Sequence, residues 1–146
     1  MPDNLSDGET VLLFVYGTLR RGFAHPMARQ LARRARYLGA GRVNGRLYRV
    51  SHYPGLLPTT HPREWVSGDL YDLSASPALL GQLDRYEGLG RGSRRLSEYA
   101  RGVTMVWLAD GSSRMAGVYF YRKPVRRLAR LVSGDFLRER RRHPQR

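Results

Sequence analysis

The sequence of 146 residues contains no cysteine and a single lysine, Lys123. The lack of thiols excludes disulfide bonds, a cysteine nucleophile and cysteine-ligated zinc or iron–sulfur sites. No run of about 18 apolar residues occurs, which excludes a membrane-spanning helix. The four histidines, at positions 25, 52, 61 and 143, form neither an HExxH motif nor an i, i+4 pair, so they indicate no metal site.

Residues 1–10 are polar and contain Asp3, Asp7 and Glu9 but no basic residue. A secretory signal has the opposite pattern, so we expect a cytoplasmic protein without membrane association. The length is typical of one domain. We therefore expect a disordered N-terminal segment over residues 1–10, one domain over residues 11–136 and a basic C-terminal tail over residues 137–146.

The formal net charge is +14, and the excess lies in two blocks. Residues 20–49 contain nine arginines and no acidic residue, residues 122–146 contain ten basic and two acidic residues, and residues 50–121 are neutral overall. Arginine clusters are typical of phosphate contacts in nucleic-acid-binding proteins. The alternative, which we favour, is a general compositional preference for arginine, with most of these side chains on solvated faces.

Apolar runs and turn residues predict the order strand, helix, strands, helix, hairpin. Strands are expected over 11–16, over 37–50 with a bend, over 65–73, and over 103–108 and 115–121 as a hairpin. Helices are expected over 27–36 and from Pro77 to a stop at Gly88, with a loop over 52–62 and a basic helix or loop over 126–142. The order lacks the βαβ rhythm of a doubly wound sheet. It predicts an α+β protein with a mostly antiparallel, curved sheet or barrel and two or three helices.

The first candidate site is the turn Tyr16-Gly17-Thr18-Leu19, directly after the first expected strand. A strand that runs into Gly-Thr exposes successive backbone N–H groups, which can form an anion-binding concavity. Gly17 permits close approach of the backbone to a ligand. The pattern does not match the phosphate-binding P-loop. The alternative is a tight turn with Tyr16 in the core.

The second candidate is Glu87, in the segment Leu83–Gly88. It falls at the C-terminal end of the expected helix, where the helix dipole disfavours an ionised carboxylate. Asp84, three residues earlier on the same face, acts in the same direction. Both effects are expected to raise the pKa of Glu87 toward the range useful for general acid/base catalysis. The alternative is a solvated side chain or a salt bridge to a nearby arginine.

Several short motifs together resemble the γ-glutamylcyclotransferase-like family, also known as the AIG2-like or BtrG-like group. Each motif is unspecific alone, but their order and spacing over residues 11–136 are specific. They are Val15-Tyr16-Gly17-Thr18-Leu19-Arg20-Arg21-Gly22, Val43-Asn44-Gly45-Arg46-Leu47-Tyr48, Tyr53-Pro54-Gly55-Leu56, Val66-Ser67-Gly68-Asp69-Leu70-Tyr71, Leu83-Asp84-Arg85-Tyr86-Glu87-Gly88, Tyr99-Ala100-Arg101 and Ser133-Gly134-Asp135-Phe136.

The resemblance implies a small mixed, mostly antiparallel β-barrel with flanking helices and a substrate cavity. It implies an enzyme that cyclises a γ-glutamyl group: the substrate's α-amine attacks its own γ-carbonyl and releases 5-oxoproline and an amine. Glu87 would be the catalytic acid/base, and the substrate would be held by Tyr16, Gly17, Thr18 and Leu19. Tyr99 would line the cavity, with core packing as the alternative. The reaction needs no metal or cofactor.

The partner implied by the resemblance is a small-molecule γ-glutamyl substrate, and the basic block that begins at Arg20 would attract anionic substrates of this kind. One alternative is a binding module that keeps the fold without the chemistry, and the intact Glu87 argues against it. The other is an arginine-rich nucleic-acid-associated protein. The lack of a helix-turn-helix, zinc-finger or RNA-binding signature argues against that function.

Overall fold

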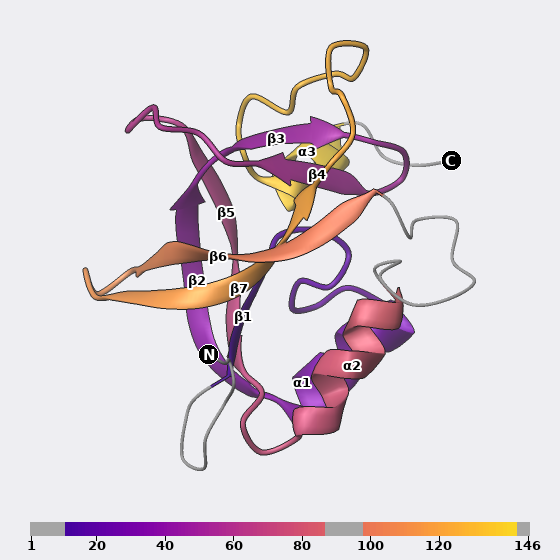
Figure 1. Ribbon diagram of the computed structural model, residues 1–146, viewed down its shortest axis with the longest axis vertical. Coiled ribbons are helices and arrows are strands. Elements are labelled where there is room, and N and C mark those ends of the chain that lie inside the picture. The colour runs from indigo at the N-terminus through magenta and orange to yellow at the C-terminus, as the bar shows by residue number, and fades with distance from the viewer. Residues whose placement is uncertain (1–10, 87–97, 143–146) are drawn as a thin grey trace.

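The computed structural model describes residues 11–86 and 98–142. Within these residues the chain forms seven strands and three helices (Figure 1). In chain order they are β1 Leu12–Val15, α1 Pro26–Arg34, β2 Arg36–Asn44, β3 Arg46–Arg49, β4 Pro54–Leu57, β5 Trp65–Asp72, α2 Pro77–Tyr86, β6 Tyr99–Leu108, β7 Ser113–Tyr121 and α3 Phe136–Arg142. None of these helices is long and apolar enough to cross a membrane.

Five of the strands close into a mixed barrel in the order β1-β5-β2-β6-β7. β1 pairs antiparallel with β5 on one side and parallel with β7 on the other, where Leu13 faces Gly117. This parallel pairing closes the barrel. β4 extends the sheet from a later part of β7, where Leu56 faces Phe120, and β3 pairs with β4. The expected α+β class, with a mostly antiparallel barrel and flanking helices, is confirmed.

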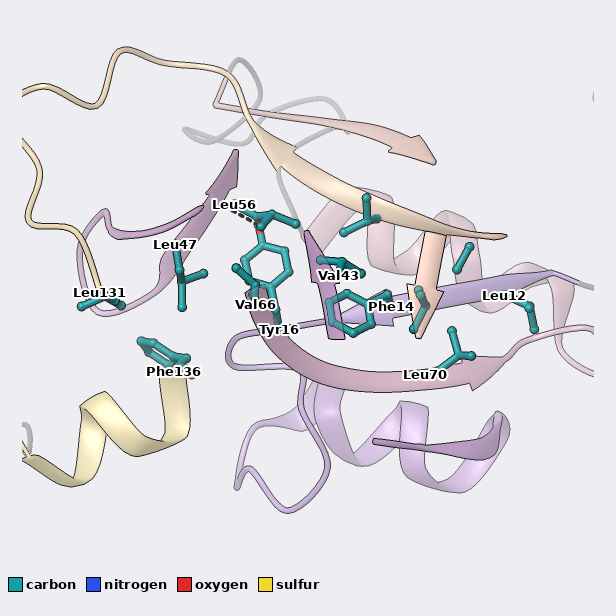
Figure 2. Close-up of a cluster of buried hydrophobic side chains, with 13 residues drawn as sticks. Leu12, Phe14, Tyr16, Val43, Leu47, Leu56, Val66, Leu70, Leu131 and Phe136 are labelled. Atoms are coloured by element: carbon teal, nitrogen blue, oxygen red, sulfur yellow. Dashed lines mark hydrogen bonds between the residues drawn. The ribbon is translucent and has the colours of Figure 1, made fainter. Parts of the chain in front are cut away.

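The first strand is a continuous apolar run because both of its faces are buried. Leu12 and Phe14 point into the barrel, where they pack among the residues drawn in Figure 2. Leu13 and Val15 point outward and pack in a second cluster, which includes Leu31 of α1 and residues of α2. β1 is therefore held between two cores, and the point at which the strand ends is fixed from both sides.

The local sequence signals for the N-terminal helix and for the C-terminal hairpin are confirmed. α1 begins at Pro26, after the N-cap His25, whose Nδ1 accepts the N–H of Met27 at 3.1 Å. β6 and β7 pair as an antiparallel hairpin whose turn includes Gly111. The expected helix over residues 77–87 begins at Pro77 as α2, and its expected stop, Gly88, lies outside the described residues.

The expectation of a loop over residues 52–62 is wrong for Pro54–Leu57, because these residues form β4. Pro54 and Gly55 are typical loop residues, and for this reason the sequence predicts a loop here. Pro54 is the first residue of β4, a position in which proline is tolerated because its missing N–H removes no internal ladder bond. The strand exists because it pairs with two others, β3 and β7. The residues of β4 themselves carry no sequence pattern that indicates these pairings.

The hydroxyl of Tyr16 joins β4 to β7 at the point where β1 leaves the edge of β7. It donates to the C=O of Tyr119 at 2.6 Å. It also accepts the N–H of Leu56 at 3.1 Å, which is the dashed line in Figure 2. All three residues are buried. A side chain thus supplies the connection that a continuous backbone ladder would otherwise make between β4 and β7.

We predict that Tyr16→Phe lowers the free energy of unfolding by about 2–4 kcal/mol. The variant keeps the ring but leaves the buried N–H of Leu56 and the buried C=O of Tyr119 without their shared partner. Urea unfolding followed by circular dichroism measures the change.

The matched control is Tyr71→Phe. Tyr71 is fully buried, and in the described part of the chain its hydroxyl has no hydrogen-bond partner. Burial, followed by the negative charge of Asp69, raises the pKa of Tyr71 to about 12, so the hydroxyl stays neutral. Removing it is expected to leave the free energy of unfolding unchanged or to raise it by up to about 1 kcal/mol. Equal losses in the two variants would contradict the role of Tyr16.

Candidate active site

The chain turns sharply after β1. The N–H of Arg20 donates to the C=O of Gly17 at 3.0 Å, which closes a four-residue turn over residues 17–20. A Cβ atom on Gly17 would lie 2.7 Å from Cδ of Pro54, which is closer than carbon atoms pack. Glycine at this position therefore allows the turn to lie directly against the start of β4.

A pocket lies at this turn. It encloses about 360 Å³ of empty space, which opens to solvent, and about 30 Å³ admits the centre of a water molecule. The described residues that line it are Phe14, Val15, Tyr16, Gly17, Thr18, Leu19, Tyr53, Pro54, Tyr99 and Tyr119. None of these side chains is charged at neutral pH. A charged ligand in this turn pocket must therefore be satisfied by backbone groups, by hydroxyls or by residues beyond this lining.

Two tyrosines hold the start of β4 against the start of β6. Tyr99 is buried, and its hydroxyl donates to the C=O of Pro54 at 2.7 Å. The ring of Tyr53 lies 6.2 Å from the ring of Tyr99, and its hydroxyl donates to the carboxylate of Glu98 at 3.0 Å. These contacts fix Tyr53, Pro54 and Tyr99, which line the pocket although they are distant from β1 in the sequence.

Asp84 connects α2 to the pocket. Its carboxylate accepts the hydroxyl of Tyr119 at 2.6 Å and the guanidinium of Arg101 at 3.1 Å. Because Tyr119 lines the pocket, the C-terminal half of α2 is fixed beside it. Glu87, the expected catalytic residue, lies outside the described residues. It follows Asp84 by three positions, and three residues span at most about 11 Å.

Asp69 on β5 holds the exit of the turn. Its Oδ2 accepts Nε of Arg20 at 3.3 Å and the backbone N–H of Arg21 at 2.9 Å, and its Oδ1 accepts the hydroxyl of Tyr37 at 3.0 Å. Asp69 is 4% exposed and Arg20 is 8% exposed. Burial, followed by the charge of Asp69, raises the pKa of Tyr37, which keeps its hydroxyl protonated as a donor. This network fixes the direction in which the chain leaves the turn.

Arg20 also connects the turn to α3. Its Nη1 donates to Oδ1 of Asp135 at 3.0 Å, and the same oxygen caps α3 by accepting two of its first backbone N–H groups, at 3.1 and 3.3 Å. Gly134 has a φ of +69°, and a Cβ there would collide with the carbonyl of Trp65. In the motif Ser133-Gly134-Asp135, the glycine therefore allows close packing against β5, and the aspartate forms an ion pair with Arg20.

The structure brings the five residues expected to bind substrate together around one pocket: Tyr16, Gly17, Thr18, Leu19 and Tyr99. Their binding role stays a prediction. The sequence analysis did not expect Tyr53, Pro54 or Tyr119 at this pocket. The motif Tyr53-Pro54-Gly55-Leu56 was the signal that could have found two of them. Among residues 11–86 and 98–142, no three His, Asp or Glu side chains gather closely enough to hold a metal ion.

Comparisons with known proteins agree with this geometry. Residues 13–138 match the family described as "Gamma-glutamyl cyclotransferase, AIG2-like". The gamma-glutamylcyclotransferase family protein YtfP of Escherichia coli (strain K12) is 34% identical over 128 residues, which are 86% of this chain and 95% of that protein. An AIG2-like protein from Mus musculus has a similar structure, with a TM-score of 0.61 and 25% identity over 77% of each chain.

The fold is also similar to that of YkqA from Bacillus subtilis, with a TM-score of 0.68 and 21% identity over 90% of this chain. This chain spans 41% of the length of YkqA.

We predict that Asp69→Asn lowers the free energy of unfolding by about 3 kcal/mol, because an amide removes the charge opposite buried Arg20 and leaves one oxygen for three donors. Thermal unfolding followed by calorimetry measures the change. The control is Asp110→Asn at the exposed β6–β7 turn, where Asp110 accepts the N–H of Ser112 at 2.9 Å. We expect its Tm to change far less, and an equal fall in both variants would contradict the role of Asp69 as an anchor.

Proposed function

The chain belongs to the gamma-glutamyl cyclotransferase, AIG2-like family, and on this premise we propose that it cyclises a γ-glutamyl amine, amide or peptide. The observation that carries the proposal is the pocket formed by the turn after β1, in a chain whose match to the family includes that turn. The products would be 5-oxoproline and the free amine.

In the proposed reaction the uncharged α-amine of the substrate attacks its own γ-carbonyl carbon. A C–N bond forms within the five-membered ring, and the C–N bond to the departing amine breaks. One proton moves from the attacking nitrogen to the departing nitrogen, so the reaction balances without a co-reactant. Because both reacting groups belong to one molecule, the substrate already has the advantage of an intramolecular over a bimolecular reaction, roughly 7–11 kcal/mol at most. The protein's task is to hold the substrate in its folded conformation and to move the proton.

The turn Gly17–Arg20 suits the task of holding the glutamyl group. Backbone N–H groups presented by a turn of this kind can stabilise the negative charge that develops on the carbonyl oxygen. The turn is fixed by Asp69 and by Tyr16, so these donors do not need to reorganise during the reaction.

The pocket needs a proton carrier from outside its described lining, because none of the lining side chains is a carboxylate or an imidazole. Two described carboxylates contact lining residues: Glu98 accepts the hydroxyl of Tyr53, and Asp84 is held by Tyr119 and Arg101. Both carboxylates already accept hydrogen bonds, and Asp84 is also in an ion pair. We therefore propose Glu87 as the general acid/base, since it follows Asp84 by three positions.

We predict that Glu87→Gln lowers the rate of 5-oxoproline release by at least about 100-fold, because glutamine has nearly the same shape but cannot take and return a proton. The measurement is 5-oxoproline formed from a panel of γ-glutamyl compounds. Glu64→Gln is the matched control, since Glu64 lies outside the pocket and pairs with Arg46 and Arg130. Full activity in Glu87→Gln, or no product from any substrate with the unaltered protein, would refute the proposal.

A further inference from the structure

A second hollow adjoins the turn pocket, and Thr18 contributes to the lining of both. In Figure 1 the loop between β1 and α1 lies between the pair of helices α1 and α2 and the β3–β4 hairpin. The described residues that line the hollow are Thr18, Phe23, Ala24, His25, Arg49, His52 and Phe136. About 300 Å³ of it admits the centre of a water molecule, against about 30 Å³ in the turn pocket. The hollow is therefore the roomier of the two.

The chemistry of the hollow differs from that of the turn pocket. Phe23 and Phe136 form an aromatic wall, with their rings stacked 6.0 Å apart at 16°. Arg49 is half-buried, and across residues 11–86 and 98–142 its guanidinium has no carboxylate or hydrogen-bond partner. None of the described lining residues is acidic. A cation in a partly desolvated site without a counter-ion is a site for an anionic group.

Two histidines also line the hollow. Nδ1 of His25 accepts the N–H of Met27 at 3.1 Å, so the proton of the neutral ring lies on Nε2 and makes that atom a donor. His52 packs edge-on against Tyr53 with ring centroids 5.0 Å apart. Tyr53 lines the turn pocket, so His52 and Tyr53 connect the two sites a second time.

We propose that this hollow binds the departing amine of the substrate, and that the substrate class is a γ-glutamyl-α-amino acid whose side chain is apolar. The proposal rests on the proposed cyclisation. With the glutamyl group in the turn pocket, the scissile bond lies beside Thr18 and the departing part extends into the hollow. The carboxylate of an α-amino acid lies two bonds from the departing nitrogen, where it pairs with Arg49, and the side chain packs on Phe23 and Phe136.

A departing group that carries extra positive charge fits less well. A polyamine would place an ammonium group beside Arg49 with no acidic side chain in the described lining to offset the repulsion. A simple alkylamine would leave the partly desolvated guanidinium of Arg49 without a partner. The hollow thus distinguishes departing amines by whether they carry a carboxylate. The turn pocket, which holds the glutamyl group, does not make this distinction.

The test compares γ-glutamyl-phenylalanine with γ-glutamyl-phenethylamine, two compounds that differ only by the carboxylate of the departing group. Calorimetry in the Glu87→Gln background, in which the compounds are not consumed, gives the Kd of each. The release of 5-oxoproline by the chain with Glu87 gives KM and kcat. We expect the full chain to bind the carboxylate compound at least about 10-fold more tightly, the scale of one charge-assisted hydrogen bond. Arg49→Met should remove this preference by weakening only the carboxylate compound, and Arg49→Lys should restore part of it.

The matched control is Arg114→Met, because Arg114 is exposed on β7 and lines neither site. It should keep the full preference for the carboxylate compound. Equal Kd values for the two compounds with Arg49 in place, or an unchanged ratio in Arg49→Met, would overturn the inference even if both compounds release 5-oxoproline. A clear preference without any release of 5-oxoproline would instead support the carboxylate site and refute the cyclisation.

Discussion

The shared edge of β7 is the constraint on which the rest of the structure depends. β1 closes the barrel along one part of this edge, β4 pairs with a later part, and the hydroxyl of Tyr16 bridges β4 and β7 where β1 departs. Tyr16 is also the first residue after β1, so the interaction that joins these strands determines where the turn Gly17–Arg20 begins. A pocket forms here because the backbone leaves the ladder at a place that rigid strands surround.

The turn is positioned from several directions by side chains that come from distant parts of the chain. Asp69 on β5 and Asp135 at the start of α3 hold Arg20 beyond the turn, and Pro54 on β4 lies against Gly17. Asp84 holds α2 beside the pocket by accepting a hydrogen bond from the hydroxyl of Tyr119. A site fixed in this way keeps its geometry without a bound ligand, as the proposed intramolecular reaction would require.

The sequence predicted those parts of the fold that have local causes. The apolar run of β1, the proline at the start of α1 and the turn of the β6–β7 hairpin each act within a few residues. β4 was missed because Pro54 and Gly55 are loop residues that become a strand only through partners distant in the sequence. Tyr119 was not expected at the pocket, because the sequence predicts a strand here but not which residues of other elements lie against it. The anchoring role of Asp69 likewise depends on three distant donors, so only the resemblance to a family indicated its importance.

The placement of the arginines changes the meaning of the charge excess. Within the basic block of residues 20–49, several arginines are engaged in contacts inside the molecule: Arg20 with Asp69 and Asp135, Arg46 with Glu64, and Arg21 and Arg42 over the rings of Tyr37 and Trp65. Arg20 is buried between two carboxylates, so its charge is compensated within the molecule. Arg49, in contrast, faces a hollow beside the pocket without an acidic partner in the described lining. The net charge is therefore a poor guide to the ligand, and the pairing of individual arginines is a better one, because a cation recognises an anion only where the fold has left it uncompensated.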